Sequence, residues 1–211
     1  MAKLNSINPA NGQILGSVKA ATKAEIEIAV KQARIGFLKW REVPLKKRAL
    51  ILAKVSQNLT KQAKSLSQLL SQEMGKPLIE AEGEVALTIN YLNFYTKSAG
   101  KYLQDEILHK DKQATSILRY DPVGVVAVIK PWNFPILTSI WALAPAILTG
   151  NSVIFKPADL TALASQELVK LFWQAGVPKE VLQVLHGRGV GQRLVDSQVD
   201  MVSFTGSTAV G

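Results

Sequence analysis

The sequence predicts an α/β fold in which a mostly helical N-terminal region is followed by the first half of a parallel sheet. Up to about residue 100, apolar residues recur at helical spacing. From residue 117 onward, short apolar runs alternate with helical stretches. Strands that alternate with helices at this spacing are typical of a parallel sheet with right-handed crossovers. At most four strands fit into this part of the chain, so we expect the sheet to be incomplete.

Residues 1–119 are expected to form two short strands and three long helices. The strands lie within residues 7–19, on either side of the Asn11-Gly12 turn. Thr22 and Glu25 form a capping box, which opens the first helix. The three helices are predicted from Thr22 to Pro44, from Leu45 to Gly75 and from about Ile79 to Ala99.

Residues 120–211 are expected to hold the sheet. Gly124–Ile129 is a continuous apolar run, which is typical of a strand buried on both faces. Residues 116–122, just before it, predict an edge strand or one arm of a hairpin. The apolar signal recurs in later strands at residues 152–155, 181–185 and 201–204. Helices are predicted between them at residues 136–148, 161–175 and 190–197.

The composition favours an ordered globular protein, with 47% hydrophobic and 19% charged residues. No apolar run reaches the roughly 18 residues that a membrane span needs. The N-terminus lacks the apolar core of a signal peptide, so we expect a cytoplasmic protein with no membrane partner. The chain has no cysteine, and its two histidines, His109 and His186, are too few for a histidine metal cluster; no metal site is expected.

The net charge of +9 raises the question of a nucleic-acid partner. The excess lies entirely in residues 1–119, which carry 19 basic and 10 acidic residues, whereas residues 120–211 carry 6 of each. The basic residues are spread over helix faces as single lysines, without the interleaved aromatic residues that stack on bases. We therefore interpret the charge as a solvated basic face and expect no nucleic-acid partner.

Unusual sequences follow each predicted strand, and parallel sheets bind ligands outside the carboxyl ends of their strands. The four segments are Lys130-Pro-Trp-Asn-Phe-Pro135, Lys156-Pro-Ala-Asp159, Gly187-Arg-Gly-Val-Gly191 and Thr205-Gly-Ser-Thr-Ala-Val-Gly211. With these segments in this order, the chain from Asn8 to Gly211 resembles the aldehyde dehydrogenase superfamily. The segment Glu73-Met-Gly-Lys-Pro77 resembles the branch that includes succinate-semialdehyde dehydrogenases.

The resemblance implies that residues 120–211 are the first part of a Rossmann-like NAD(P)-binding domain, on which residues 1–119 pack. Asn133 sits where the family has an amide that donates to the aldehyde oxygen and stabilises its developing negative charge. Without the flanking motifs, a purely structural role in a Pro-rich loop would be the better interpretation of Asn133. Trp141 occupies the position at which succinate-semialdehyde dehydrogenases tend to have an arginine, and its indole favours an uncharged aldehyde.

Lys156 and Asp159 resemble the pair that holds the adenosine ribose of the cofactor. An acidic side chain accepts from the ribose 2′-hydroxyl and repels a 2′-phosphate, which favours NAD, with NADP possible. The alternative is that Asp159 or Thr161 merely caps the following helix. The other positions that the resemblance assigns to the cofactor are Ile129, Lys130, Pro131, Trp132, Pro157, Ala158, Gly189, Gly206 and Ser207.

The family oxidises aldehydes to carboxylic acids with a cysteine nucleophile and a glutamate general base. This chain has no cysteine and no segment matching that of the glutamate, so the resemblance implies an N-terminal fragment that is inactive alone. Such a fragment could be an expressed segment or a gene product cut short, and it would leave apolar strand surface uncovered. A non-catalytic dinucleotide-binding or interaction module is the alternative. The complete enzyme is expected to be a homo-oligomer.

Overall fold

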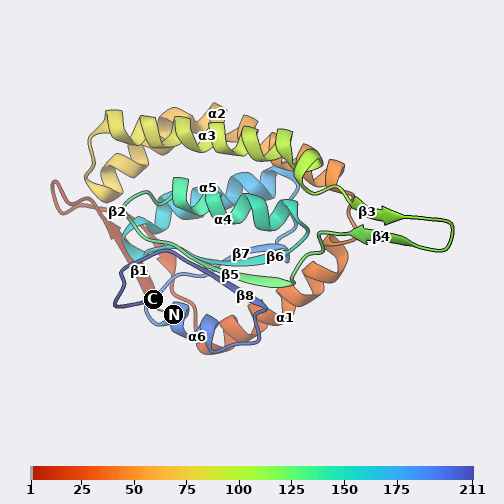
Figure 1. Ribbon diagram of the computed structural model, residues 1–211. Helices are drawn as coiled ribbons and strands as arrows, with labels where there is room; N and C mark the ends of the chain where they lie inside the picture. Colours follow the sequence, from red (N-terminus) through yellow and green to blue (C-terminus); the bar gives the residue numbers. More distant parts are fainter. Residues whose placement is uncertain (1) are drawn as a thin grey trace.

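The computed structural model describes residues 2–211, and its N-terminal part has the predicted hairpin and three helices (Figure 1). The position of the first strand was predicted wrongly, because the strand ends at Ile7, where the predicted range of residues 7–19 begins. Strands β1 (Lys3–Ile7) and β2 (Ile14–Lys19) form an antiparallel hairpin. The helices are α1 (Lys23–Trp40), α2 (Leu45–Met74) and α3 (Leu78–Tyr102). The capping box of α1 is confirmed, since Glu25 donates its backbone N–H to Thr22 Oγ1 at 3.3 Å. Gly75 ends α2 with a φ of 78°, which glycine adopts without strain.

The sheet is parallel throughout, as predicted, and its strand order is β7-β6-β5-β8. Three crossover helices connect its strands, and a short 3₁₀ helix, η1 (Asp159–Thr161), precedes the second of them. The strands are β5 (Val125–Ile129), β6 (Ser152–Lys156), β7 (Leu182–Val184) and β8 (Met201–Phe204). The crossover helices are α4 (Leu137–Leu148), α5 (Ala162–Ala175) and α6 (Val190–Val195).

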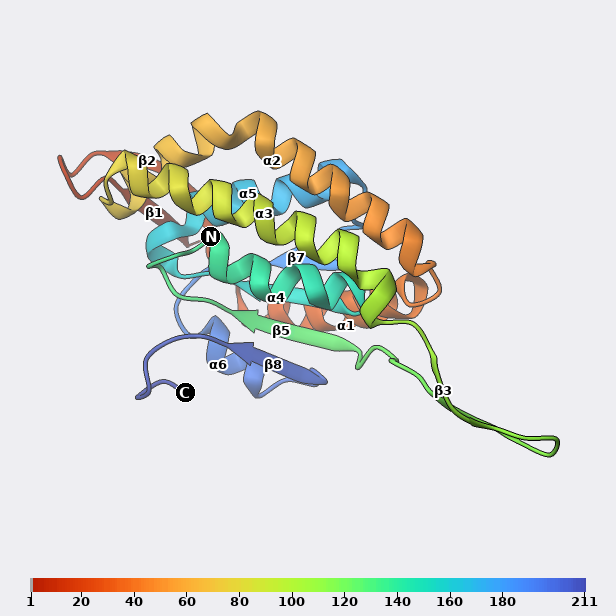
Figure 2. The ribbon, with the colours of Figure 1, turned by 45° about the horizontal axis from the view of Figure 1, so that its top comes forward.

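Helices cover both faces of the sheet (Figures 1 and 2). On one face lie α4 and α5, and α2 and α3 form a second layer above them; α1 and α6 lie on the other face. Along β5, Val126 and Val128 belong to the large core under α2–α5, whereas Val125 and Ala127 face the smaller core under α1 and α6. Both faces of this strand are therefore buried, as its apolar run predicted.

The strand order reverses beside β5. The chain runs from β5 to β6 to β7 on one side and then returns to place β8 on the other side of β5. Ligands of open parallel sheets bind in the crevice where the order reverses, at the carboxyl ends of the strands. This topology directs attention to the residues that follow β5 and β8.

The structure adds one strand that the sequence did not predict. Strand β3 (Glu106–Lys110) pairs with β4 (Thr115–Leu118) in an antiparallel hairpin that projects from the body of the molecule (Figure 2). Every residue of both strands is exposed, so neither strand has a buried face. The sequence of β3 accordingly lacks the alternation of apolar and polar residues by which a half-buried strand is recognised. At the other extreme of the chain, β8 is an edge strand whose Met201, Val202 and Phe204 side chains are exposed.

Among residues 2–211, no helix is long and apolar enough to cross a membrane. Within the same range, no group of three or more histidine, cysteine, aspartate or glutamate residues is arranged to hold a metal ion.

Candidate functional site

Lys130 lies at the carboxyl end of β5, at the point where the strand order reverses. Its side chain is buried and crosses to the neighbouring strand, where Nζ donates to Ser203 Oγ at 3.1 Å and to Thr205 Oγ1 at 3.0 Å. Burial lowers the pKa of this ammonium group. Lys130 therefore joins the ends of β5 and β8 and sets the spacing between the segments that follow them.

The segment after β5 opens into a groove of about 720 Å³, which we call the Asn133 groove. Asn133, Trp132 and Phe134 are exposed in it, and Trp141 of α4 lines it as well. The groove thus brings together the segments that follow β5 and β8, which the sequence predicted separately, with residues of α3 and α4. Its lining consists of Leu87, Pro131, Trp132, Asn133, Phe134, Leu137, Thr138, Trp141, Thr205, Gly206 and Ser207. No charged residue is part of this lining.

Two buried residues that the sequence analysis did not single out support the groove from behind. Lys76 Nζ forms an ion pair with Glu84 Oε2 at 2.6 Å and donates to the backbone oxygen of Asn133 at 3.0 Å. Glu84 Oε1 accepts from the backbone N–H groups of Ile136 and Leu137, at 3.0 and 3.2 Å. Lys76 lies in the Glu73-Met-Gly-Lys-Pro77 segment, but no sequence pattern connects that segment with residues 133–137.

Lys156 and Asp159 form the second predicted part of the site. Ile129 and Lys156 are register partners in adjacent strands, so this pair lies beside the end of β5. Lys156 Nζ contacts Asp159 Oδ1 at 3.0 Å, and the same oxygen accepts from the backbone N–H of Gly187 at 3.2 Å. The Asp159 side chain is 22% exposed and the Lys156 side chain 14%, so both groups reach the surface while their positions are fixed.

The capping alternative holds only in position, because Thr161 occupies the N-cap position of α5 without bonding to the helix through its side chain. The N-cap residues of η1 and α5 are Ala158 and Thr161, and neither forms a side-chain cap hydrogen bond. Asp159 bonds instead to Lys156 and to the loop after β7. The α5 N-terminus is satisfied by Glu73, whose carboxylate accepts from the backbone N–H groups of Leu163 and Ala164 at 2.9 and 2.7 Å. The sequence analysis missed this role for Glu73.

His186 immediately precedes Gly187, whose backbone N–H group bonds to Asp159. It is 4% exposed, and its Nε2 lies 3.1 Å from Gln166 Oε1, while Nδ1 is buried and has no hydrogen-bond partner among residues 2–211. Burial lowers the pKa of the imidazole to about 4. The imidazole is therefore neutral near pH 7, and it adds no charge to the Lys156–Asp159 pair.

The two predicted glycines differ in backbone conformation, since Gly189 has a positive φ and Gly206 does not. Gly189 precedes α6 with a φ of 74° and is exposed. Gly206 and Ser207, after β8, are exposed and line the Asn133 groove, whereas Gly189 does not. Pro157 and Ala158 connect Lys156 with Asp159. Their side chains are apolar and therefore form no hydrogen bonds.

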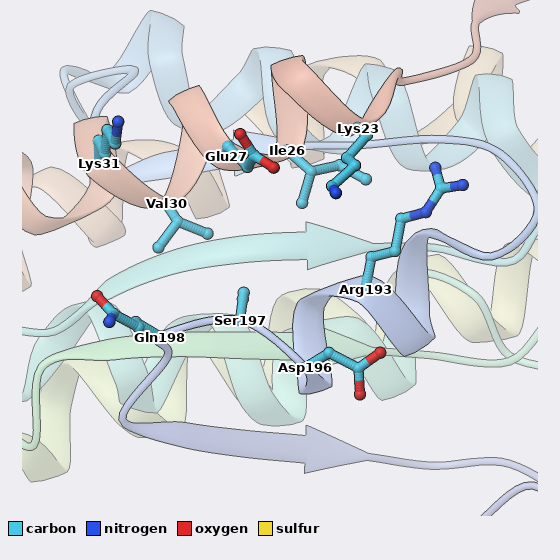
Figure 3. Close-up of a pocket in the computed structure, with 9 residues that line it drawn as sticks. All are labelled: Lys23, Ile26, Glu27, Val30, Lys31, Arg193, Asp196, Ser197 and Gln198. Carbon is cyan, nitrogen blue, oxygen red and sulfur yellow. The ribbon is translucent and has the colours of Figure 1, made fainter.

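A further cavity of about 590 Å³ lies between α1 and α6 (Figure 3). Lys23, Glu27 and Lys31 reach it from α1, and Arg193 and Asp196 from α6 and its C-cap. All five charged side chains are exposed. It contains none of the residues that the sequence predicted for the site.

The chain is similar to aldehyde dehydrogenases over its whole length. The model of the aldehyde dehydrogenase family matches residues 2–211. D-glyceraldehyde dehydrogenase (NADP(+)) of Picrophilus torridus is 37% identical over 99% of this chain, which spans 43% of that protein. Alpha-ketoglutaric semialdehyde dehydrogenase of Bacillus subtilis is 37% identical over 97% of the chain, again 43% of the relative.

Solved structures agree with this similarity. The crystal structure of indole-3-acetaldehyde dehydrogenase in complex with NAD+ matches 99% of this chain with a TM-score of 0.93 and 34% identity, and the chain covers 43% of it. The sequence thus spans less than half the length of the relatives that it matches. On the strength of the family match across residues 2–211, the chain belongs to the aldehyde dehydrogenase family.

Proposed function

We propose that this chain supplies part of the cofactor site and the oxyanion-stabilising amide of an NAD(P)-dependent aldehyde dehydrogenase. In the complete enzyme, the activity would be oxidation of an aldehyde to a carboxylic acid. The observation that carries the proposal is the convergence of Asn133, Lys156, Asp159 and Ser207 at the carboxyl ends of the parallel strands, beside the reversal of strand order.

The Lys156–Asp159 pair fits the adenosine ribose of a nicotinamide cofactor. An ammonium group donates to sugar hydroxyls and a carboxylate accepts from them, and here both groups are partly exposed and already held in place. Gly206 and Ser207 leave room for the pyrophosphate, to which the Ser207 hydroxyl could donate. Ile129, Lys130, Pro131, Trp132, Pro157, Ala158 and Gly189 complete the proposed cofactor contacts. The cofactor, when bound, supplies the hydride acceptor.

Asn133 is the proposed oxyanion donor. Its side chain is exposed in the groove, and its amide N–H group donates without carrying a charge of its own. One such donor contributes about 3–4 kcal/mol to the stability of a transition state in which negative charge develops on oxygen. The nucleophile is not among the residues of this chain, which has no cysteine.

Asp159 favours NAD over NADP in this proposal. Its Oδ1 is fixed by Lys156 and Gly187, so the carboxylate cannot swing away from a 2′-phosphate without breaking two contacts. The named relatives include an enzyme specified for NADP(+) and one whose structure contains NAD+. Family membership alone is therefore compatible with either cofactor, and the preference rests on the charge of Asp159.

The lining of the Asn133 groove favours an uncharged aldehyde. Trp132, Phe134 and Trp141 give it aromatic walls, and the Lys76 ammonium behind the Asn133 backbone is paired with Glu84. A substrate carboxylate would have no free cation among the lining residues to receive it. The similarity of Glu73–Pro77 to the succinate-semialdehyde dehydrogenase branch points the other way, and we give the groove more weight because it would contact the substrate.

A homo-oligomer is also part of the proposal for the complete enzyme. The β3–β4 hairpin exposes Ile107, Leu108, Ile117 and Leu118 on a projection from the molecule. Exposed apolar strands with free edges favour pairing with another chain.

Calorimetric titration of the 211-residue chain with NAD tests the cofactor site directly. We expect weak binding that saturates at higher than micromolar concentration, because loss of 2–3 kcal/mol of contacts costs about one to two orders of magnitude in affinity. Lys156→Ala should weaken the binding further, whereas Lys170→Ala, on the exposed surface of α5, should leave it unchanged. Equal affinity for all three proteins would refute the assignment of Lys156.

A further inference from the structure

We propose that Lys76 and Glu84 are positioning residues that fix the Asn133 loop, residues 130–136, and thereby aim the Asn133 amide into its groove. The inference rests on the proposed function, in which that amide receives the oxygen of the aldehyde. Neither residue lines the groove. Both act through backbone groups of the loop and of the helix that follows it.

The contacts hold the loop at its middle and at its C-terminal end. Lys76 Nζ donates to the Asn133 backbone oxygen at 3.0 Å, and its ammonium lies 4.5 Å from the centre of the Phe134 ring. Glu84 Oε1 accepts from the N–H groups of Ile136 and Leu137. Within the described residues, the side-chain amide of Asn133 forms no hydrogen bond, so the loop is held by its backbone and the functional group is left free.

The start of α4 explains why this support is needed. Its N-cap residue, Ile136, has no side chain that could accept a hydrogen bond, and the preceding Pro135 has no N–H group. The first N–H groups of a helix lack partners within the helix and must find acceptors elsewhere. Glu84, from the second turn of α3, provides that acceptor, so the Asn133 loop is tied to an element that is distant in sequence.

Burial of the Lys76–Glu84 ion pair costs free energy of desolvation. We take this cost as a sign that the pair serves to position the loop and not to stabilise the fold. The side chains of Lys76 and Glu84 are 5% and 0% exposed, so both charges are removed from water. A buried pair gains little over a well-packed apolar pair, but removal of one partner leaves an uncompensated charge. Here each charge has a second set of partners in the loop, and those partners specify one loop conformation.

Hydrogen exchange on the 211-residue chain tests the inference. In Glu84→Gln, one oxygen must serve both Lys76 and the N–H groups of Ile136 and Leu137; pairing with the ammonium turns the NH2 group toward those N–H groups and removes their acceptor. In Lys76→Met, the Asn133 carbonyl loses its donor. We expect the amides of Ile136 and Leu137 to exchange at least about tenfold faster relative to Leu143 in the same helix. Lys76→Arg, which keeps the charge, should restore most of the protection. Glu167→Gln and Lys170→Met, which break an exposed pair on α5, should leave these amides unchanged.

Two results would overturn the inference. One is unchanged exchange at Ile136 and Leu137 in both variants, and the other is equal acceleration along all of α4, which would indicate a general loss of stability. If the variants do not fold, the unmodified chain still decides: these two amides must be protected as strongly as that of Ile140. Failure of the chain to bind NAD would count against the proposed function and leave the exchange result as it stands.

Discussion

Glu73 and Arg48 show the same use of buried charge outside the groove. Glu73 accepts from the first N–H groups of α5 and from Ser6 Oγ at 2.6 Å. The Arg48 guanidinium donates to the backbone oxygen of Leu148 at 2.8 Å and to that of Val43 at 2.5 Å. Burial raises the pKa of Glu73 and lowers that of Arg48, which reflects the cost of placing each charge there. In both cases the charge satisfies backbone groups that the ends of helices leave without partners.

Asp159→Ser tests cofactor choice in a chimera in which this chain is joined to the remaining part of the Bacillus subtilis relative. The substitution removes the charge that opposes a 2′-phosphate and supplies a donor, so the ratio of NADP to NAD efficiency should rise. A tenfold rise corresponds to about 1.4 kcal/mol, which is a small interaction energy for a partly solvated charge and a phosphate. The measurement is kcat/KM with each cofactor. Lys156→Ala is the comparison, because it should weaken both cofactors. An unchanged ratio in Asp159→Ser would withdraw the NAD preference.

His186 should make the chain less stable in mild acid. Its pKa is about 4 in the folded chain against an ordinary value of 6.5, so the unfolded chain binds a proton that the folded chain excludes between these pH values. The stability due to neutral His186 is therefore fully present above pH 6.5 and is lost as the pH falls toward 4, by up to about 3 kcal/mol.

Urea unfolding between pH 7.5 and 4.5 measures this effect. The unmodified chain should lose stability as the pH falls, whereas His186→Gln has no group to protonate at this position and should not show that loss. The difference between their free energies of unfolding should therefore shrink. His109→Gln, at an exposed position in the β3–β4 hairpin, serves as the matched control. Parallel pH profiles for His186→Gln and the unmodified chain would show that the buried imidazole does not couple to folding.

At the scale of elements, Gly36 and Gly83 give opposite predictions for the same substitution. A Cβ atom on Gly36 of α1 would lie 2.5 Å from the backbone oxygen of Glu180, whereas one on Gly83 of α3 would meet nothing within 4 Å. Gly36→Ala should therefore destabilise the chain by about 2 kcal/mol, because backbone must move to admit the methyl group. Gly83→Ala should stabilise it by about 0.5–1 kcal/mol through helix propensity. Urea unfolding of both variants checks the signs, and a stable Gly36→Ala would contradict the close packing of α1 against residue 180.

The local elements could be predicted from the sequence where one pattern governed them. The capping box at Thr22 and the apolar run of β5 each depend on neighbouring residues, and both are confirmed. Strand β3 could not be predicted from periodicity, because all of its residues are exposed and neither of its faces is buried. It is held by its backbone pairing with β4. Helix α4 was predicted although it contains Pro145, because the residues before the proline are mostly apolar and show the helical pattern.

The candidate site was predictable only in part, for a similar reason. Residues that follow strands, such as Asn133 and Asp159, could be located from the family motifs and the order of elements. Lys76 and Glu84 could not, because their partners are 57 and 52 residues away and depend on how α3 packs beside α4. Contacts that link elements distant in sequence leave no local periodicity to read.

At the scale of the whole molecule, the sheet places two groups of residues side by side. The Lys156–Asp159 pair follows β6, the Asn133 loop follows β5, and Lys130 joins the ends of β5 and β8. Under the proposed function, the donors for a ribose and for an aldehyde oxygen thus lie at the same end of the sheet. It lacks the thiolate that the family uses to attack the aldehyde, so binding and chemistry should be separable in it.

The last prediction follows from that separation. The purified chain should oxidise no aldehyde above background with NAD or NADP, because no cysteine is present to form the covalent intermediate. The chimera with the Bacillus subtilis relative should be active, and Asn133→Ala should then lower its kcat by about 10²–10³-fold, the usual effect of removing one oxyanion donor. Asn90→Ala, on the exposed side of α3, is the matched control and should retain activity. Turnover by the chain alone would disprove the fragment interpretation, and equal rates for the two variants would remove Asn133 from the proposed mechanism.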